Sequence, residues 1–119
     1  MNSPDWMEKA RRVAQSFEAT TRGQRNAGHS VYVVLLHDPA RLGRWGLYVG
    51  QTSRDPDLRF DQHKAGYKAS RAVTRYGVRL VPNLVDHLNP LHAWEALDLE
   101  AALALGFSDA GIAWIEGGH

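Results

Sequence analysis

Cysteine is absent from this chain of 119 residues, which excludes disulfide bonds, thiolate zinc sites and a cysteine nucleophile. Long hydrophobic runs are absent too. The longest, Val31 to Leu36, has six residues, whereas about 20 are needed to span a bilayer. The first residues carry Asp5 and Glu8 without an apolar stretch, unlike a secretory signal. We therefore expect no membrane association and a cytoplasmic location.

Positive charge is missing from the last third of the chain. Residues 80–119 contain six Asp and Glu and no Lys or Arg, whereas residues 54–79 contain seven Lys and Arg against three Asp. The formal net charge of +1 hides this division. A short cationic segment suggests a local anionic partner such as a nucleic-acid backbone. The alternative is a charged helix face that only keeps the surface solvated.

The remaining composition, 44% hydrophobic and 23% charged, is ordinary for one globular domain. Turn formers between apolar stretches mark the ends of the predicted elements. The pattern predicts helices over about 4–19, 56–65, 70–76 and 91–105, and strands over 31–36, 46–50, 78–82 and 112–115. The first two strands are expected to form a hairpin. This order predicts a small α/β (α+β) fold with a mostly antiparallel sheet flanked by helices.

Glu100 is the most informative acid of the sequence. Its helical neighbours at i±3 and i±4 are all Ala or Leu, so its carboxylate emerges from an apolar face. A buried charge needs a cationic partner, either a metal ion or an arginine. The alternatives are a rim position that reaches solvent and a structural salt bridge. Glu95 has a mixed and wetter set of neighbours, so a functional role is not expected for it.

Two helical residues can address one ligand. Arg59 and His63 are spaced i, i+4 and therefore share a helix face. Arginine suits phosphate because its planar fork donates parallel hydrogen bonds, and histidine can relay a proton near neutral pH. A surface cation and an exposed histidine are the alternatives. Tyr32 and Tyr48 fall in adjacent predicted strands, where cross-strand packing is the common role of tyrosine.

Taken in order, these residues resemble the GIY-YIG nuclease superfamily. The two motifs are Val31-Tyr32-Val33 and Leu47-Tyr48-Val49-Gly50-Gln51-Thr52. Arg59 follows eleven residues after Tyr48, and His63 follows four residues later. Glu100 ends the segment 95–100, which is similar to the metal-binding helix of the family. The resemblance covers about residues 30–116. The chain is therefore divided into a helix and loop extension, 1–29, and a nuclease-like domain, 30–119.

The resemblance implies a three-stranded antiparallel sheet and one divalent cation, Mg²⁺ or Mn²⁺, held by Glu100. It implies that Arg59 stabilises charge on the phosphate and that Tyr32 or His63 assists deprotonation of the attacking water. Tyr48 would position water or phosphate. A phosphodiester transition state gains charge on its nonbridging oxygens, which suits an arginine and a metal ion. A tyrosine with a pKa of about 10 is a poor base unless nearby cations lower that pKa.

The first hypothesis is therefore a metal-dependent endonuclease that hydrolyses phosphodiester bonds in DNA, branched or single-stranded DNA included. Four cations would hold the DNA backbone: Lys64, Lys68, Arg71 and Arg75. In one continuous helix these four would form a single stripe. The alternative is a catalytically inactive nucleic-acid- or protein-binding module on the same fold. Two departures motivate it, Ser30-Val31-Tyr32 in place of Gly-Ile-Tyr and Gln51 where several members have lysine. A toxin or restriction-type nuclease is a third possibility.

Overall fold

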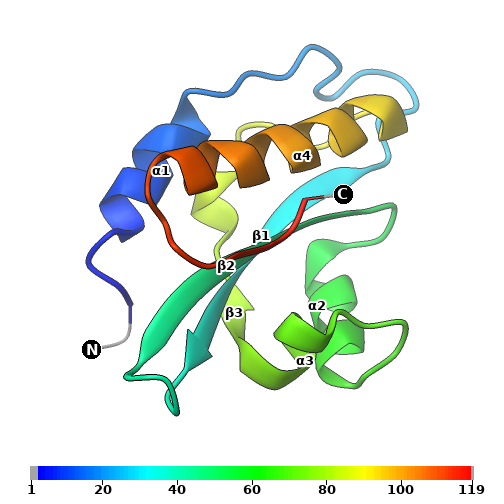
Figure 1. Cartoon of the computed structure of the whole chain (residues 1–119). Coiled ribbons are helices and arrows are strands. Elements are labelled where there is room, and N and C mark those ends of the chain that lie inside the picture. Colours follow the sequence, from blue (N-terminus) through cyan, green and yellow to red (C-terminus); the bar gives the residue numbers. More distant parts are fainter. Residues whose placement is uncertain (1–2, 119) are drawn as a thin grey trace.

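A four-stranded sheet lies at the centre of the structure, a computed structural model that describes residues 3–118 (Figure 1). Its strands are β1 (Ser30–Asp38), β2 (Arg44–Thr52), β3 (Gly77–Leu80) and β4 (Ile115–Gly117), in the order β3-β1-β2-β4. β1 pairs antiparallel with β2 and β3, and β4 runs parallel to β2. The α+β class and the predicted hairpin are confirmed. The three-stranded sheet is wrong by one strand, because β4 adds a parallel edge.

The helices are α1 (Met7–Gln15), α2 (Pro56–Lys64), α3 (Arg71–Tyr76) and α4 (Ala93–Asp109), with a short 3₁₀ helix, η1 (Pro82–Leu84). The predicted extension, 1–29, and the predicted nuclease-like domain, 30–119, each include residues outside the described range: residues 1–2 and residue 119. Among residues 3–118, none of the helices has the length and apolar character needed to cross a bilayer.

Three predicted element boundaries are corrected by the structure. α1 begins a turn after Pro4, whose carbonyl accepts a hydrogen bond from the Met7 N–H. α4 continues through Gly106, where even a methyl group would lie 3.2 Å from the Phe17 ring. The last strand is residues 115–117 and not 112–115, because Ile112 and Trp114 are buried in the two separate apolar clusters on either side of the sheet. Packing decides the last two of these boundaries over local propensity.

Both faces of the sheet are covered, which explains the continuous apolar run of β1. α1 and α4 lie on one face, and α2 and α3 lie on the other (Figure 1). Odd-numbered β1 residues such as Val31 and Val33 join the cluster under α1 and α4. Even-numbered residues such as Tyr32 and Val34 join the cluster under α2 and α3. This alternation follows from the two-residue period of a strand and places the tyrosine side chains on the α2 face.

The segment before β1 packs onto the same core as the sheet. Ala10 and Ala14 of α1 are fully buried, and Trp6, Val13 and Phe17 pack against the α4 cluster. These side chains therefore cover the sheet on the α4 side.

Candidate functional site

Two tyrosines and a glycine form the floor of the site on the α2 face of the sheet. The rings of Tyr32 in β1 and Tyr48 in β2 lie 6.1 Å apart between centroids. Gly50 is the cross-strand partner of Tyr32, and a methyl group there would lie 2.5 Å from Tyr32 Cζ and 2.6 Å from its hydroxyl oxygen. Such distances are far inside van der Waals contact, so only glycine allows the Tyr32 ring to lie across β2. The sequence motif includes Gly50 but does not indicate this role.

His63 approaches this floor from α2. The helix begins after Asp55, whose carboxylate accepts a hydrogen bond from the Asp57 N–H at 2.8 Å, and Pro56 occupies the first turn. Near the end of α2, His63 Nε2 lies 2.8 Å from the Tyr32 hydroxyl. The His63 side chain is 1% exposed. The alternative of an exposed helical histidine is therefore wrong.

The hydrogen bonds of His63 fix its tautomer. The backbone N–H of Ser70, the N-cap of α3, donates to His63 Nδ1 at 3.0 Å. A backbone N–H can only donate, so Nδ1 carries no proton and a neutral ring must carry it on Nε2. Nε2 therefore donates to the Tyr32 hydroxyl oxygen. In this arrangement His63 donates to Tyr32 and cannot accept a proton from it.

The environment keeps all three groups neutral. Burial, and secondarily the Arg59 charge, lower the pKa of His63 to about 4. Burial is also the main cause that raises the pKa of both Tyr32 and Tyr48. The hydrogen bond between the two side chains raises the pKa of Tyr32 and lowers that of Tyr48. Because the Tyr32 oxygen accepts from His63 Nε2, the Tyr32 O–H is left to donate to Tyr48. The chain of donors thus runs from His63 through Tyr32 to Tyr48, which is the more exposed of the two tyrosines.

Arg59 lies one turn before His63 and supplies the positive charge of the site. Its positive charge lowers the pKa values of Tyr32, Tyr48 and His63. The guanidinium donates to the carbonyls of Tyr67 and Lys68 at 3.2 and 2.7 Å and to the Gln62 side chain at 3.3 Å. These bonds use three of its five N–H donors. Within the described part of the chain, Nε–H and one Nη2–H remain for a ligand.

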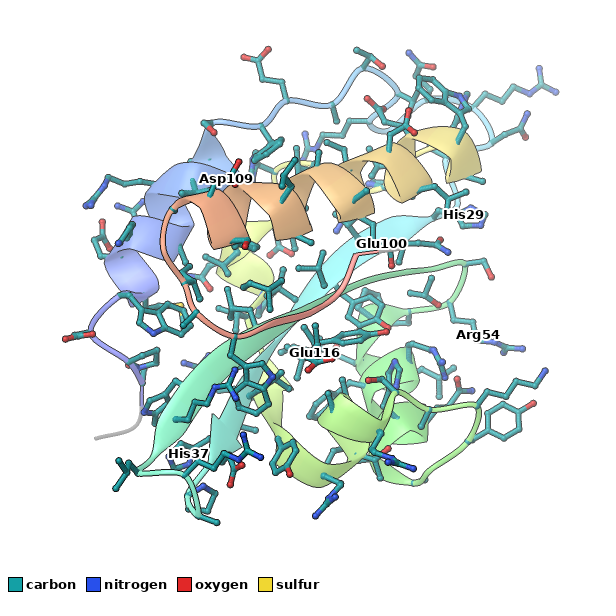
Figure 2. All side chains as sticks on the ribbon, viewed as in Figure 1. His29, His37, Arg54, Glu100, Asp109 and Glu116 are labelled. Atoms are coloured by element: carbon teal, nitrogen blue, oxygen red, sulfur yellow. The ribbon has the colours of Figure 1, made fainter. Side chains whose placement is uncertain are left out.

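Glu100 comes from α4, the helix on the opposite face of the sheet. Figure 2 shows it on the side of α4 that faces the sheet, and it is 5% exposed. Its negative charge raises the pKa of both Tyr32 and Tyr48, so it lies within electrostatic reach of the tyrosine hydroxyls. The alternative of a rim residue that reaches solvent is wrong. Residues separated by up to 68 positions thus meet at one place.

Glu95 is a structural residue and is not on a wet surface. It is 6% exposed, and its carboxylate accepts four hydrogen bonds of 2.6–3.0 Å from the backbone N–H and hydroxyl groups of Thr20 and Thr21. Burial raises its pKa, but these four bonds outweigh burial and lower the pKa to about 2. The neighbours of Glu95 within its helix could not reveal this, because the partners come from a loop more than 70 residues earlier.

The four predicted phosphate-binding cations separate into two groups. The predicted stripe does not form, because α2 ends at Lys64 and α3 begins at Arg71. The Lys64 ammonium donates to the carbonyls of Val73, Thr74 and Gly77 at 3.5, 3.2 and 2.9 Å. Those bonds use all three of its donors, so Lys64 joins α2 to α3. Lys64 is exposed, as are the other three, Lys68, Arg71 and Arg75, but its ammonium is held by these carbonyls.

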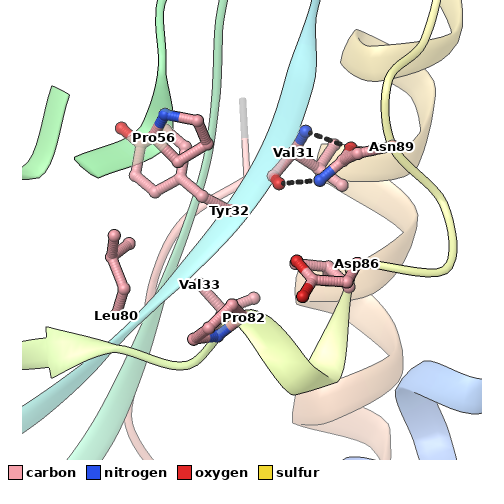
Figure 3. A pocket seen from close by; sticks show the side chains of 9 residues that line it. Val31, Tyr32, Val33, Pro56, Leu80, Pro82, Asp86 and Asn89 are labelled. Carbon is pink, nitrogen blue, oxygen red and sulfur yellow. Dashed lines mark hydrogen bonds between the residues drawn. The ribbon is translucent and has the colours of Figure 1, made fainter. Parts of the chain in front are cut away.

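A polar pocket of about 160 Å³ adjoins Arg59. It is lined by the end of β2 and the residues after it, by α2, and by the turn after α2: Thr52, Ser53, Arg54, Arg59, Gln62, Tyr67 and Lys68. The sequence pattern did not predict it, because its residues come from three separate segments. An apolar hollow of about 30 Å³ lies beside β1, where both polar atoms of the Asn89 amide pair with the Val31 backbone (Figure 3). That hollow has room for about one water molecule.

The donor set fits a hydrated divalent cation better than a fully protein-bound one. Within residues 3–118, no group of three or more His, Asp or Glu side chains gathers to hold a metal ion. Mg²⁺ commonly binds through one or two carboxylates and keeps several waters or substrate oxygens. Glu100 provides one such carboxylate. Glu116, the parallel partner of Tyr48 in β4, accepts a hydrogen bond from Trp114 Nε1 at 3.0 Å.

Comparison of the chain with family models, with curated proteins and with solved structures found no significant match.

Proposed function

We propose that this protein is a metal-dependent endonuclease that hydrolyses phosphodiester bonds in DNA, on a GIY-YIG-like fold. The observation that supports the proposal is that side chains from distant parts of the sequence meet at one site. A buried carboxylate, an arginine and a histidine–tyrosine–tyrosine chain of hydrogen bonds come from four elements, β1, β2, α2 and α4, and meet at one site. A phosphoryl-transfer site needs a cation for the developing charge, a carboxylate for a metal ion and a polar group for the water. A cytoplasmic location remains part of this proposal.

In this proposal Arg59 binds the phosphate under attack. Three of its hydrogen bonds fix the guanidinium before substrate arrives, so little reorganisation is needed when charge develops. Glu100 would hold Mg²⁺ or Mn²⁺. A divalent cation, when bound, supplies Lewis-acid polarisation of a phosphoryl oxygen and lowers the pKa of a bound water.

The direction of the hydrogen bonds assigns the tyrosine roles. Tyr32 is 3% exposed and its oxygen accepts the hydrogen bond from His63 Nε2, so it does not contact the attacking water. Tyr48 is half-buried and is the last group of this hydrogen-bond chain, which makes it the group that orients the water. Donation from Tyr32 and the Arg59 charge lower the Tyr48 pKa, but burial has the larger effect and raises it, so Tyr48 acts as a neutral phenol. Tyr32 and His63 are then positioning residues.

The test compares two carboxylates of one helix. Glu100→Gln keeps the size of the side chain and removes its charge, and Asp98→Asn makes the same change at an exposed position. With supercoiled plasmid and Mg²⁺ or Mn²⁺, we expect nicking that a chelator stops. Nicking should fall by at least about 100-fold in Glu100→Gln and stay unchanged in Asp98→Asn. Full cleavage by Glu100→Gln would reject the assignment.

A binding module without turnover is the second candidate. It is favoured by the raised pKa of both tyrosines and by Gln51, which stands where several members of the similar family have lysine. The buried Gln51 Oε1 accepts no hydrogen bond within residues 3–118. DNA binding without nicking of supercoiled, linear, single-stranded or branched substrates, with either metal ion, would support this candidate over the nuclease.

A further inference from the structure

The pocket beside Arg59 has the composition of an anion site. Three cationic side chains line it, Arg54, Arg59 and Lys68, and within the described residues none of its lining side chains is acidic. Thr52 and Ser53 add hydroxyl groups. At about 160 Å³ its volume exceeds that of a water molecule, about 30 Å³ in the liquid, several-fold. An anionic group with part of its hydration therefore fits inside.

The walls of the pocket are fixed before a ligand binds. The Thr52 hydroxyl, in a side chain that is 7% exposed, accepts a hydrogen bond from the Arg54 N–H at 3.0 Å. Arg59 holds the opposite wall through the Tyr67 and Lys68 carbonyls, and the Tyr67 N–H donates to the Gln62 carbonyl at 2.9 Å. Figure 2 shows Arg54 in the connection between β2 and α2.

Tyr67 places an exposed aromatic ring at the rim of the pocket. Its side chain is 57% exposed, and the Lys68 ammonium lies 5.7 Å from its ring centroid. The backbone bonds at its N–H and carbonyl hold the residue in place, so exposure of the ring is built into the turn. An aromatic ring beside a cationic groove is the usual platform on which an unpaired base stacks.

We propose that this pocket binds the phosphate of an unpaired nucleotide next to the scissile bond, with the base of that nucleotide stacked on Tyr67. The proposal rests on the proposed nuclease function for the position of the scissile phosphate at Arg59, and it names the substrate class as DNA with a single-stranded segment at the cut. A paired base cannot stack on Tyr67, because its faces are covered by its neighbours in the duplex. The pocket therefore distinguishes single-stranded or branched DNA from a continuous duplex.

The test measures binding with a chelator present, so that it does not depend on cleavage. The probes are a fluorescein-labelled 15-nucleotide oligothymidine and a blunt duplex of equal length, followed by fluorescence anisotropy. We expect the single strand to bind more tightly than the duplex. Tyr67→Leu should weaken single-strand binding about tenfold, and Tyr67→Trp should restore it. Trp94→Leu, which removes an aromatic ring of nearly equal exposure (56%) on α4, is the matched control and should bind like the natural protein.

The phosphate contact has its own test. Arg54→Gln should weaken single-strand binding and reduce the slope of log K against log salt by about 0.7, the value for one phosphate contact on a single strand. Arg12→Gln, an exposed arginine on α1, should leave the slope unchanged. An unchanged affinity in Tyr67→Leu, or a duplex bound as tightly as the single strand, overturns the proposal. Single-strand binding through Tyr67 without nicking by the metal-loaded protein upholds the pocket and rejects the nuclease.

Discussion

His63 is the residue whose surroundings say most about its chemistry. Both ring nitrogens have hydrogen-bond partners, the Ser70 N–H and the Tyr32 hydroxyl, and the ring is buried. An imidazolium would turn Nδ1 into a second donor facing the Ser70 N–H, which cannot accept. The structure therefore selects the neutral ring with its proton on Nε2.

We predict that His63 stays neutral well below pH 6.5. Its folded pKa of about 4 lies below the value of about 6.5 in an unfolded chain. The contribution of the neutral His63 ring to the free energy of unfolding is therefore complete above pH 6.5, and it is lost as the pH falls toward 4. An NMR titration of the ring checks this, since ¹⁵N shifts distinguish a bare Nδ1 from a protonated Nε2. A midpoint near 6.5, or a proton on Nδ1, would contradict the tautomer.

Gly50 gives a second prediction at the scale of one residue. In Gly50→Ala the new methyl group overlaps Tyr32 Cζ and its hydroxyl oxygen, so the ring must move away from His63. We expect a loss of roughly 1–3 kcal/mol in the free energy of unfolding, together with loss of nuclease activity. Gly28→Ala is the control, because a methyl group there meets no atom within 4 Å among the described residues. Equal denaturation midpoints for the two variants would show that the overlap is relieved at no cost.

At the scale of elements, α4 is held at its N-terminal end by the loop before β1. The four hydrogen bonds to Glu95 connect that loop to the helix five residues before Glu100. The position of the metal-binding candidate along the sheet therefore depends on Thr20 and Thr21.

We predict that Glu95→Gln lowers the free energy of unfolding by roughly 2–4 kcal/mol at pH 7, because the amide NH₂ group cannot accept the N–H bonds. The folded pKa of about 2 lies below about 4.3 for unfolded glutamate. The carboxylate therefore stabilises the fold fully above about pH 5, and this contribution is lost as the pH falls to 2. Urea unfolding at several pH values measures both effects. Glu18→Gln, in the same loop and exposed, should show neither.

α2 and α3 give the fourth prediction, which separates structural from binding cations. Lys64→Met removes three hydrogen bonds to carbonyls and should lower stability by roughly 1–3 kcal/mol without changing the salt dependence of DNA binding. The paired change Arg71→Gln and Arg75→Gln should do the reverse, reducing the salt slope on duplex DNA by about 0.9 for each phosphate that is no longer neutralised. Thermal melts measure the change in stability, and binding titrations at several salt concentrations measure the change in salt slope. A change in the salt slope of DNA binding in Lys64→Met would show that Lys64 contacts the DNA.

Much of the fold could be predicted at this scale, because its signals are local. The β-branched run of β1 and the cap and proline before α2 determine their elements with little help from the rest of the chain. Gly106 shows where local signals fail: as a helix terminator it is overruled by close packing against Phe17 and Val13. The short β4 carries almost no local pattern and exists because it pairs with β2.

The site was predictable in part, and only through a motif. Tyr32, Tyr48, Arg59, His63 and Glu100 were all named from the sequence. Their roles were not, since the orientation of His63 depends on a backbone N–H at the start of α3, and the use of Lys64 depends on carbonyls up to 13 residues later. Spacing indicates which side chains share a face, but it does not give their hydrogen-bond partners.

At the scale of the whole molecule, the cationic segment 54–79 lies on one face of the sheet. It forms α2, α3 and most of β3, whereas the acidic segment 80–119 contains α4 on the other side, which α4 shares with α1 and its Lys9, Arg11 and Arg12. A polyanion is therefore attracted to the tyrosine face. The salt slopes of the Arg71 and Arg75 variants distinguish DNA binding at this face from a charged face that only solvates the protein.

The link between Thr20, Thr21 and Glu95 also bears on anyone who trims this chain for expression. A fragment starting at residue 30 would retain every side chain of the candidate site: Tyr32, Tyr48, Arg59, His63 and Glu100. It would nevertheless leave the buried Glu95 carboxylate without its hydrogen bonds from Thr20 and Thr21. It would also remove α1, which packs against α4. Shortened versions should keep the chain from Pro4 onward, or activity lost to misplacement of one helix will be mistaken for absence of catalysis.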